Sequence, residues 1–321
     1  MVNFTSNTYQ MKREILSFSN KISKNLPKPE KKFMADMNYG ILASGSCLLT
    51  NSNHPVSIFS EIHSSEEKNF TSINTVTFSA MDRAAALFGK ATFVMDRGYD
   101  DNKMFLKLDS LHQDYVIRLT AKRKLLYYNK WMFATELRNR RKGKVKLPLF
   151  YKGKKHNAYL SHVKVQITAS RKDIYLVLVY GITEHPMMLA TNKEIKSKDD
   201  VIKIAKLYFS RWKIEEYFRC KKQMFQLENF RVRKLKAINA LNFHITLCMA
   251  FLNQISLKSE TNALKVAIIQ TADPVKEKIV FCYYRLAKGI SGILSYAKEG
   301  IRLWFRTKRP AYRQLRLKLA V

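Results

Sequence analysis

The most restrictive feature of this sequence is the change between strand-like and helix-like patterns over residues 91–120. The apolar run ATFVM is typical of a buried strand, and Asp96 follows it directly. A helical spacing of apolar residues comes next, and the run YVIRLT, which begins at Tyr115, predicts another strand. This order predicts an α/β fold with parallel strands, in which functional residues lie at the carboxyl ends of the strands. Asp96 has that position.

The segments before this core are predicted to be mostly helical. Residues 1–50 show helical spacing interrupted at Pro27 and Pro29, which indicates an N-terminal helical module. Residues 51–121 form the first part of the core in this interpretation. They comprise one strand from Pro55, a helix that ends at Gly89, and the strand, helix and strand described above.

A β-rich insertion is predicted over residues 122–195, because apolar runs alternate with turn residues and no helical spacing intervenes. Within it, residues 138–155 carry nine Lys or Arg residues and no acid. Two interpretations of this segment remain open. It is either a mobile basic loop laid against phosphates or an exposed, solvated hairpin.

Helical spacing returns over residues 196–256, where Ser197 and Asp200 have the spacing of a capping box. Residues 257–321 are predicted to form a basic, helical C-terminal region. The expected architecture is therefore an α/β core with a β-rich insertion and helical parts at both ends.

The charge of the chain points to a polyanionic partner. Its 58 Lys and Arg residues against 25 Asp and Glu residues give a formal net charge of +33. Such a surface repels itself unless it is neutralised, which favours nucleic acid over a membrane surface, although a merely solvated basic face remains the alternative. Hydrophobic residues make up 46% of the chain, so it can bury a sizeable core.

Several other classes of protein are disfavoured by the sequence. The four cysteines have no close pairs, which fits a reducing cytoplasm and neither a zinc site nor a disulfide framework. No phosphate-binding loop motif is present, so no nucleoside triphosphate is expected. The longest apolar stretch is interrupted by polar residues, and no membrane partner is expected.

The segment YFSRWKIEEYFRCKK contains the most informative constellation. On an α-helix, Arg211, Glu215 and Lys222 lie at about −60°, −20° and −40° relative to Tyr208, so the four side chains share one face. One carboxylate among groups that grip phosphates suits a metal-binding acid beside a DNA strand. Ordinary ion pairs on a helix surface are the alternative, because Arg211 and Glu215 are four residues apart.

These four residues form a Tyr-Arg-Glu-Lys signature. Together with Asp96 in the phrase FVMDRGYD, the chain resembles the insertion-sequence-4-type bacterial transposases, which have a DDE active site on an RNase H-like fold. The resemblance implies that Asp96 and Glu215 are the second and third acids and hold Mg²⁺ or Mn²⁺. It also implies that Tyr208, Arg211 and Lys222 contact double-stranded DNA at the transposon end. The resemblance further implies a homodimer bound to paired transposon ends, located in the bacterial cytoplasm at the nucleoid.

The sequence departs from this family before residue 55. The first acid belongs on the first strand of a three-stranded meander, but the chain has room for about one strand before the first core helix. Asp36 is the nearest upstream acid, in a helical context, and Asp82 lies inside the predicted core helix. We therefore expect an internally deleted copy whose active site lacks one ligand.

Three hypotheses remain at this point. The first is a DDE transposase by ancestry, with metal-dependent cleavage and strand transfer impaired in this copy. The second is a non-catalytic DNA-binding remnant that competes with intact transposase. The third, an RNA-binding structural protein, explains the charge but not an acid on a basic helical stripe.

Overall fold

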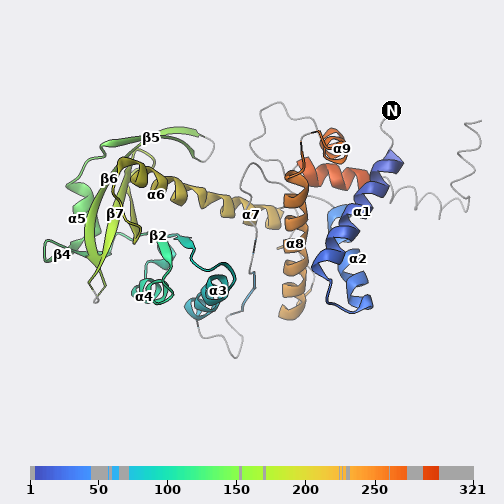
Figure 1. Cartoon of the computed structure of the whole chain (residues 1–321), viewed down its shortest axis with the longest axis horizontal. Coiled ribbons are helices and arrows are strands. Elements are labelled where there is room, and N and C mark those ends of the chain that lie inside the picture. Colours follow the sequence, from blue (N-terminus) through green and yellow to red (C-terminus); the bar gives the residue numbers. More distant parts are fainter. Residues whose placement is uncertain are drawn as a thin grey trace, which may run out of the picture. The chain divides into compact units, whose positions relative to one another are not determined.

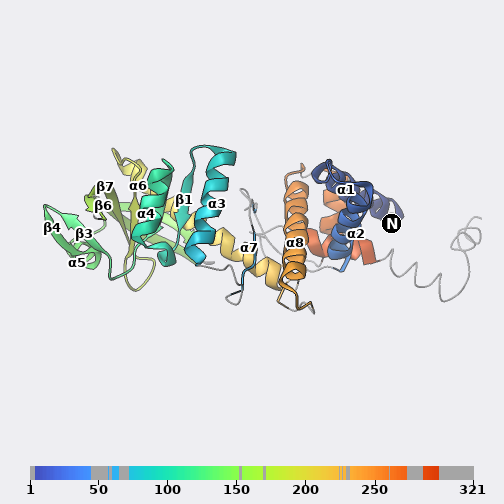
Figure 2. The ribbon, with the colours of Figure 1, turned by 90° about the horizontal axis from the view of Figure 1, so that it is seen from below.

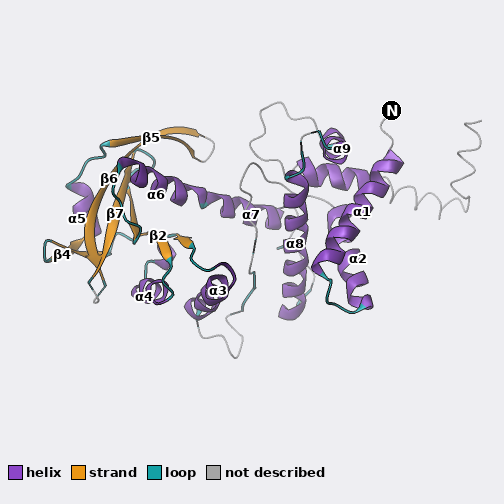
Figure 3. Cartoon of the chain, viewed as in Figure 1, coloured by secondary structure: helices purple, strands orange, loops and turns teal. Residues whose placement is uncertain are grey.

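The computed structural model divides the chain into two compact units. One, Thr71–Trp212, contains all the described strands and is called the sheet unit here (Figure 3). The other combines Met1–Phe70 with Lys213–Val321 and is called the helical unit. The structure describes residues 4–44, 57, 60–64, 72–151, 154–168, 171–223, 225, 227–228, 232–259, 261–272 and 285–295.

The sheet unit is built on a mixed sheet of eight described strands in the order β1-β2-β8-β7-β6-β3-β4, with β5 paired to β6 (Figure 1). β1 and β2 are parallel, as predicted, and the other pairs are antiparallel. The strands are β1 (Thr92–Met95), β2 (Asp114–Arg118), β3 (Lys124–Tyr127), β4 (Lys130–Phe133), β5 (Val145–Tyr151), β6 (Lys154–Ile167), β7 (Lys172–Tyr180) and β8 (Met187–Thr191).

Helices cover both faces of this sheet. α3 (Ile73–Phe88), α4 (Asn102–Ser110) and α5 (Ala134–Asn139) contribute to the apolar cluster on one face, and α6 (Lys198–Ser210) contributes to the cluster on the other. α3 and α4 lie side by side (Figure 2). The result is a mixed α/β architecture consistent with an RNase H-like core, as the sequence predicted.

Local signals account for the ends of these elements. α3 ends at Gly89, whose φ of 66° favours glycine. At the start of α6, the Asp200 N–H donates to Ser197 Oγ, and the Ser197 N–H donates to Asp200 Oδ2 at 3.0 Å. The capping box predicted from the sequence is therefore confirmed.

The segment predicted as an insertion, residues 122–195, supplies β3 to β8, and β8 continues the sheet from β2. The expectation that it contains no helix is wrong, because α5 interrupts it. This short helix forms because Glu136 Oε1 accepts the Phe133 N–H at 3.0 Å while Ala134 and Leu137 are buried.

Residues 138–155 are for the most part not a loop. β5 pairs with β6 over residues 145–151, and the preceding basic residues include the end of α5. Along this hairpin Leu147 is buried while Lys146 is exposed, as expected for a strand with one face on the core. The pairing of β5 with β6 therefore confirms a hairpin over residues 145–151, and contact of this basic segment with phosphates stays a prediction.

The helical unit contains α1 (Phe4–Ile22), α2 (Lys28–Ser44), α7 (Trp212–Gln223, except its first residue), α8 (Leu235–Ser256) and α9 (Ala263–Thr271). Residues 285–295 are also helical. The predicted break at Pro27 and Pro29 is confirmed. Pro29 is the second residue of α2, where no backbone N–H is needed. These helices bury one shared apolar cluster.

α8 runs through the core of this unit. Among the described helices it is the one long and apolar enough to cross a membrane by length and composition. Eight of its residues are buried against the other helices, which is typical of a core helix. The strand predicted from Pro55 lies largely outside the described residues. Ile62 is held to α8, because its N–H and C=O bond to the Asn239 amide at 2.7 and 2.8 Å.

Candidate active site

Asp96 lies directly after β1, at the carboxyl end of the parallel strand pair. Its Oδ1 accepts the Gly98 N–H at 2.8 Å and caps a short 3₁₀ turn over Arg97–Tyr99. A Cβ at residue 98 would come within 3.0 Å of that Oδ1, so glycine makes room for the carboxylate. The backbone of Asp96 is extended, and side chains alternate across a strand. Asp96 therefore points to the same face as Val94.

Two other aspartates follow within five residues, and both have structural roles. The Asp100 side chain is fully buried and accepts bonds from Thr120 and Arg123 at 2.7 to 2.8 Å. Asp101 caps α4 by accepting the Lys103 N–H at 2.9 Å. In contrast, the only hydrogen bond found for the Asp96 carboxylate within the described structure is that from Gly98. Asp96 is therefore the one of the three suited to bind an external cation.

The face to which Val94 points is covered by α6. Val94 and Val116, on β1 and β2, pack in the apolar cluster that also contains Tyr208 and Phe209 near the end of α6. The first half of the predicted signature therefore lies on the same side of the sheet as Asp96.

Tyr208 is buried at 5% exposure in this cluster. The Arg211 guanidinium lies over its ring, 5.9 Å from the centroid. The Arg211 N–H bonds to the Tyr208 carbonyl at 3.1 Å, and the backbone of Arg211 is helical, with φ −58° and ψ −32°. Tyr208 thus packs against the sheet and beneath Arg211, and a contact of its ring with DNA stays a prediction.

The second half of the signature lies on α7. The side chains of Glu215 and Lys222 are exposed. Lys222 Nζ pairs with Glu228 at 2.5 Å, and both side chains are more than half exposed. Such a surface ion pair is weak, so a phosphate can compete for Lys222.

The boundary between the two units falls inside the signature, between Trp212 and Lys213. Asp96, Tyr208 and Arg211 belong to the sheet unit, whereas Glu215 and Lys222 belong to the helical unit. The expectation that the carboxylates of Asp96 and Glu215 hold metal ions together stays a prediction.

The upstream acids do not supply an evident third ligand. Asp82 pairs with Lys107 at 2.6 Å on the surface of the sheet unit. Asp36 lies in α2 of the helical unit, in the helical context that the sequence indicated. Among the described residues, no group of three or more His, Cys, Asp or Glu side chains could hold a metal ion.

Sequence analysis missed the polar cluster beside this signature. Lys221, the neighbour of Lys222, is 1% exposed. Its Nζ donates to Asn242 and Thr246 at 2.8 and 2.6 Å, and burial lowers the pKa of its ammonium group to about 8. Lys221 is next to Lys222 in the sequence, and nothing in the sequence indicates that one of the two is buried.

A mixed sheet whose parallel strand pair ends in an available aspartate, with α6 packed on that face, is consistent with the RNase H-like class of α/β domain. Residues 71–251 match the family model described as "Transposase DDE domain". That match spans more than half of the chain, which therefore belongs to the DDE transposase family. No curated protein matches the chain.

Proposed function

We propose that this chain is a transposase-like protein of the insertion-sequence-4 type that binds transposon-end DNA. The observation that carries the proposal is the placement of Asp96 after β1, on the face that α6 covers, within a DDE transposase domain. The Tyr-Arg-Glu-Lys signature supports the assignment to this type.

DNA binding in this proposal relies on charge. The chain has a net charge of +33, and binding of phosphates by Lys and Arg releases counterions from the duplex. Arg211 and Lys222 are the assigned contacts to the end DNA, and Arg can hold a phosphate through two parallel hydrogen bonds. Paired transposon ends would bring two copies of the chain together, in the bacterial cytoplasm at the nucleoid.

The donor chemistry of Asp96 and Glu215 fits Mg²⁺ or Mn²⁺, which prefer oxygen ligands. When bound, such ions can activate a water or a 3′ hydroxyl for in-line attack on a phosphodiester. In this proposal the Asp96 and Glu215 carboxylates would bind and orient the metal ions. Arg211 and Lys222 would hold the DNA strand in position. Gly98 keeps Asp96 oriented by donating its N–H to one carboxylate oxygen.

We propose further that this copy is impaired in catalysis because of an internal deletion before residue 55. Within the described structure near β1, the other aspartates already have partners: Asp82 pairs with Lys107, Asp100 with Arg123, and Asp101 caps α4. This observation favours the second candidate function, a non-catalytic remnant that occupies transposon ends and competes with intact transposase. Asp36 is the acid whose substitution tests whether another residue replaces the missing ligand.

One preparation tests both parts of the proposal. Labelled DNA carrying the terminal repeats that flank the gene is assayed for retention and for strand cleavage in Mn²⁺. We expect retention, and cleavage reduced on the order of a hundredfold or more relative to an intact relative, because an electrostatic element at a developing charge is lost. Robust cleavage that disappears in Asp36→Ala would overturn the claim of impairment. Absence of retention at low salt would overturn the proposed function.

A further inference from the structure

β1, the strand that leads to Asp96, is the last strand at one end of the described sheet. Its inner edge pairs in parallel with β2, and the Asp114 N–H donates to the Ala91 carbonyl at 3.0 Å. Backbone groups of successive residues point alternately to the two edges of a strand. The N–H and C=O groups of Thr92 and Val94 therefore point to the outer edge. Within the described structure no strand or side chain bonds to them.

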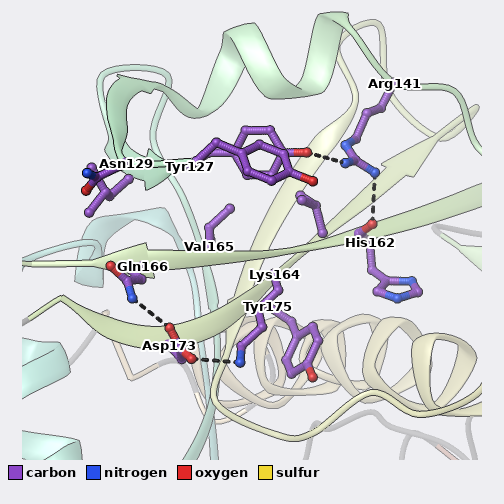
Figure 4. Close-up of a pocket in the computed structure, with 12 residues that line it drawn as sticks. Tyr127, Asn129, Arg141, His162, Lys164, Val165, Gln166, Asp173 and Tyr175 are labelled. Carbon is purple, nitrogen blue, oxygen red and sulfur yellow. Dashed lines mark hydrogen bonds and ion pairs between the residues drawn. The ribbon is translucent and has the colours of Figure 1, made fainter.

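Another open stretch of this sheet is blocked by a side chain. β6 pairs with β5 over residues 154–160 and with β3 at Gln166, and no described strand pairs with this edge between those points. Arg141 fills the gap, because its guanidinium donates to the His162 carbonyl and to the Tyr127 hydroxyl, both at 3.2 Å (Figure 4). β1 has no such protection. Its sequence, TFVM, contains neither the charge nor the proline with which edge strands commonly prevent pairing.

Apolar side chains are also incompletely covered at this end of the sheet. Phe93 packs against the apolar cluster on one face and Val94 against the cluster on the other, and both stay partly exposed. α3 ends directly before β1, and its last turn exposes Leu87 and Phe88 at 70% and 58%. Exposed apolar surface of this kind is typical of a site of protein association. A strand added at β1 would extend both apolar clusters.

The two ends of β1 carry opposite charges on one face. Asp96 follows the strand with an extended backbone, and Lys90 precedes it. Lys90 Nζ lies 3.3 Å from the carboxylate of Asp114, which pairs with Thr92 across the ladder. Because opposite residues point to one face, Lys90 lies on the face to which Asp96 also points. Asp114 has a closer partner in Lys193, at 2.6 Å, and the Lys90 side chain is 69% exposed, so Lys90 can turn to an acid on an added strand.

We propose that a second copy of this chain adds its own β1 to this edge, antiparallel to the first and about a two-fold axis through Phe93. In this register residue 92 of each copy pairs with residue 94 of the other, and residue 90 pairs with residue 96. The outward backbone groups of Thr92 and Val94 then bond to those of the second copy. Lys90 of each copy lies opposite Asp96 of the other, and opposite charges on directly paired residues attract.

The charges select this arrangement among the alternatives. A shift of one residue would place Lys90 and the opposing Asp96 on different faces of the paired sheet. A parallel alignment would bring like charges together at both ends. A neutral peptide could use the backbone of β1 but would not match the two charges. The paired state also engages the carboxylate of Asp96, which agrees with the non-catalytic candidate function, although the interface itself does not rest on DNA binding.

The test measures the mass of the full chain without DNA, by sedimentation velocity over a range of protein concentrations. About 0.3 M salt shortens the range of the repulsion between two chains of net charge +33. We expect a dimer that dissociates on dilution. Lys90→Glu and Asp96→Lys each place like charges at both ends of the paired strands and should raise the dissociation constant about tenfold or more. The double variant restores opposite charges and should return to within about threefold of the unsubstituted chain.

Further variants test the backbone pairing, the register and the site of the charge change. Thr92→Pro removes an outward N–H without touching the bonds between β1 and β2, and it should abolish the dimer. Lys130→Glu makes the same charge change on β4, at the other end of the sheet, and should leave the dimer unchanged. On oxidation, Phe93→Cys should form a disulfide between the residue-93 thiols of two copies. Thr92→Cys should not, because its equivalent positions lie about 7–8 Å apart in this register.

The outcomes separate this interface from the proposed function. A monomer at every concentration would overturn the pairing, and so would a dimer whose dissociation constant neither charge reversal changes. A dimer that forms only with end DNA would also overturn it, and would support the assembly on paired ends instead. The proposed function is tested by retention of end DNA, which none of these mass measurements involves.

Discussion

Asp100 is expected to be the most important carboxylate for the stability of the sheet unit. Its buried side chain accepts hydrogen bonds from the Thr120 N–H and Oγ1 and from the Arg123 guanidinium. These contacts tie the segment after Asp96 to the end of β2, twenty residues further along the chain. Replacement of Asp100 by Ala removes both carboxylate oxygens at once, while the backbone carbonyl of residue 100 and Asn102 Oδ1 can still accept from Arg123.

The expected destabilisation follows from what Asp100→Ala leaves behind. Arg123, whose side chain is 13% exposed, would keep a buried charge without its carboxylate, and such a loss reduces the free energy of unfolding by about 3–5 kcal/mol. Two neighbouring substitutions are matched controls. Asp101→Ala removes a helix cap and should cost about 0.5–2 kcal/mol. Asp96→Ala removes one exposed hydrogen bond and should cost no more than about 1 kcal/mol.

Urea unfolding of the full chain, monitored by far-ultraviolet circular dichroism, gives the free energy of unfolding of each of the three variants. Because the chain has two compact units and need not unfold in a single step, hydrogen exchange at the Thr120 amide supplies a local readout. Asp100→Ala should accelerate that exchange far more than either control. A loss below about 1 kcal/mol in Asp100→Ala, or an equal loss in Asp96→Ala, would refute the assignment of structural and available carboxylates.

Two further predictions concern the signature helix. Arg211→Ala and Lys222→Ala should each reduce the steepness of the fall of log affinity for end DNA with log salt by about one unit of slope. Fluorescence anisotropy at several salt concentrations measures these slopes. Unchanged slopes would show that neither side chain binds a phosphate. The lowered pKa of Lys221 gives a pH dependence. Between about pH 8 and 10.5 the unfolded chain holds more protons at this residue than the folded one, so the stability of the helical unit should rise with pH. Lys221→Met should abolish this rise in urea unfolding, and exposed Lys222→Met should not.

Local patterns predicted much of the sheet unit. The parallel pair β1 and β2, the end of α3 at Gly89 and the capping box at Ser197 all follow from periodicity and backbone preferences within a few residues. The short helix α5 was missed because six residues provide less than two turns of periodicity. Its stability comes from the burial of Ala134 and Leu137 in the sheet unit.

The sequence distinguished Asp96 by its place directly after a strand, but it could not show that Asp100 is buried and bonded. The partners of Asp100 lie 20 and 23 residues away along the chain. Likewise, helical spacing placed Tyr208 on the face of the signature but could not show that this part of the face meets the sheet. The pairing of one edge of β6 with both β5 and β3 is another feature that no local pattern encodes.

The sequence by itself determined the α/β class, the position of Asp96 at the end of a strand and a charge that favours nucleic acid, because periodicity and composition are local or additive properties. Only the tertiary structure decided which carboxylates are already bonded, which signature residues are buried, and which strands share the edge of β6. These features depend on contacts between residues far apart in the chain, and the packing of the sheet and its covering helices sets them.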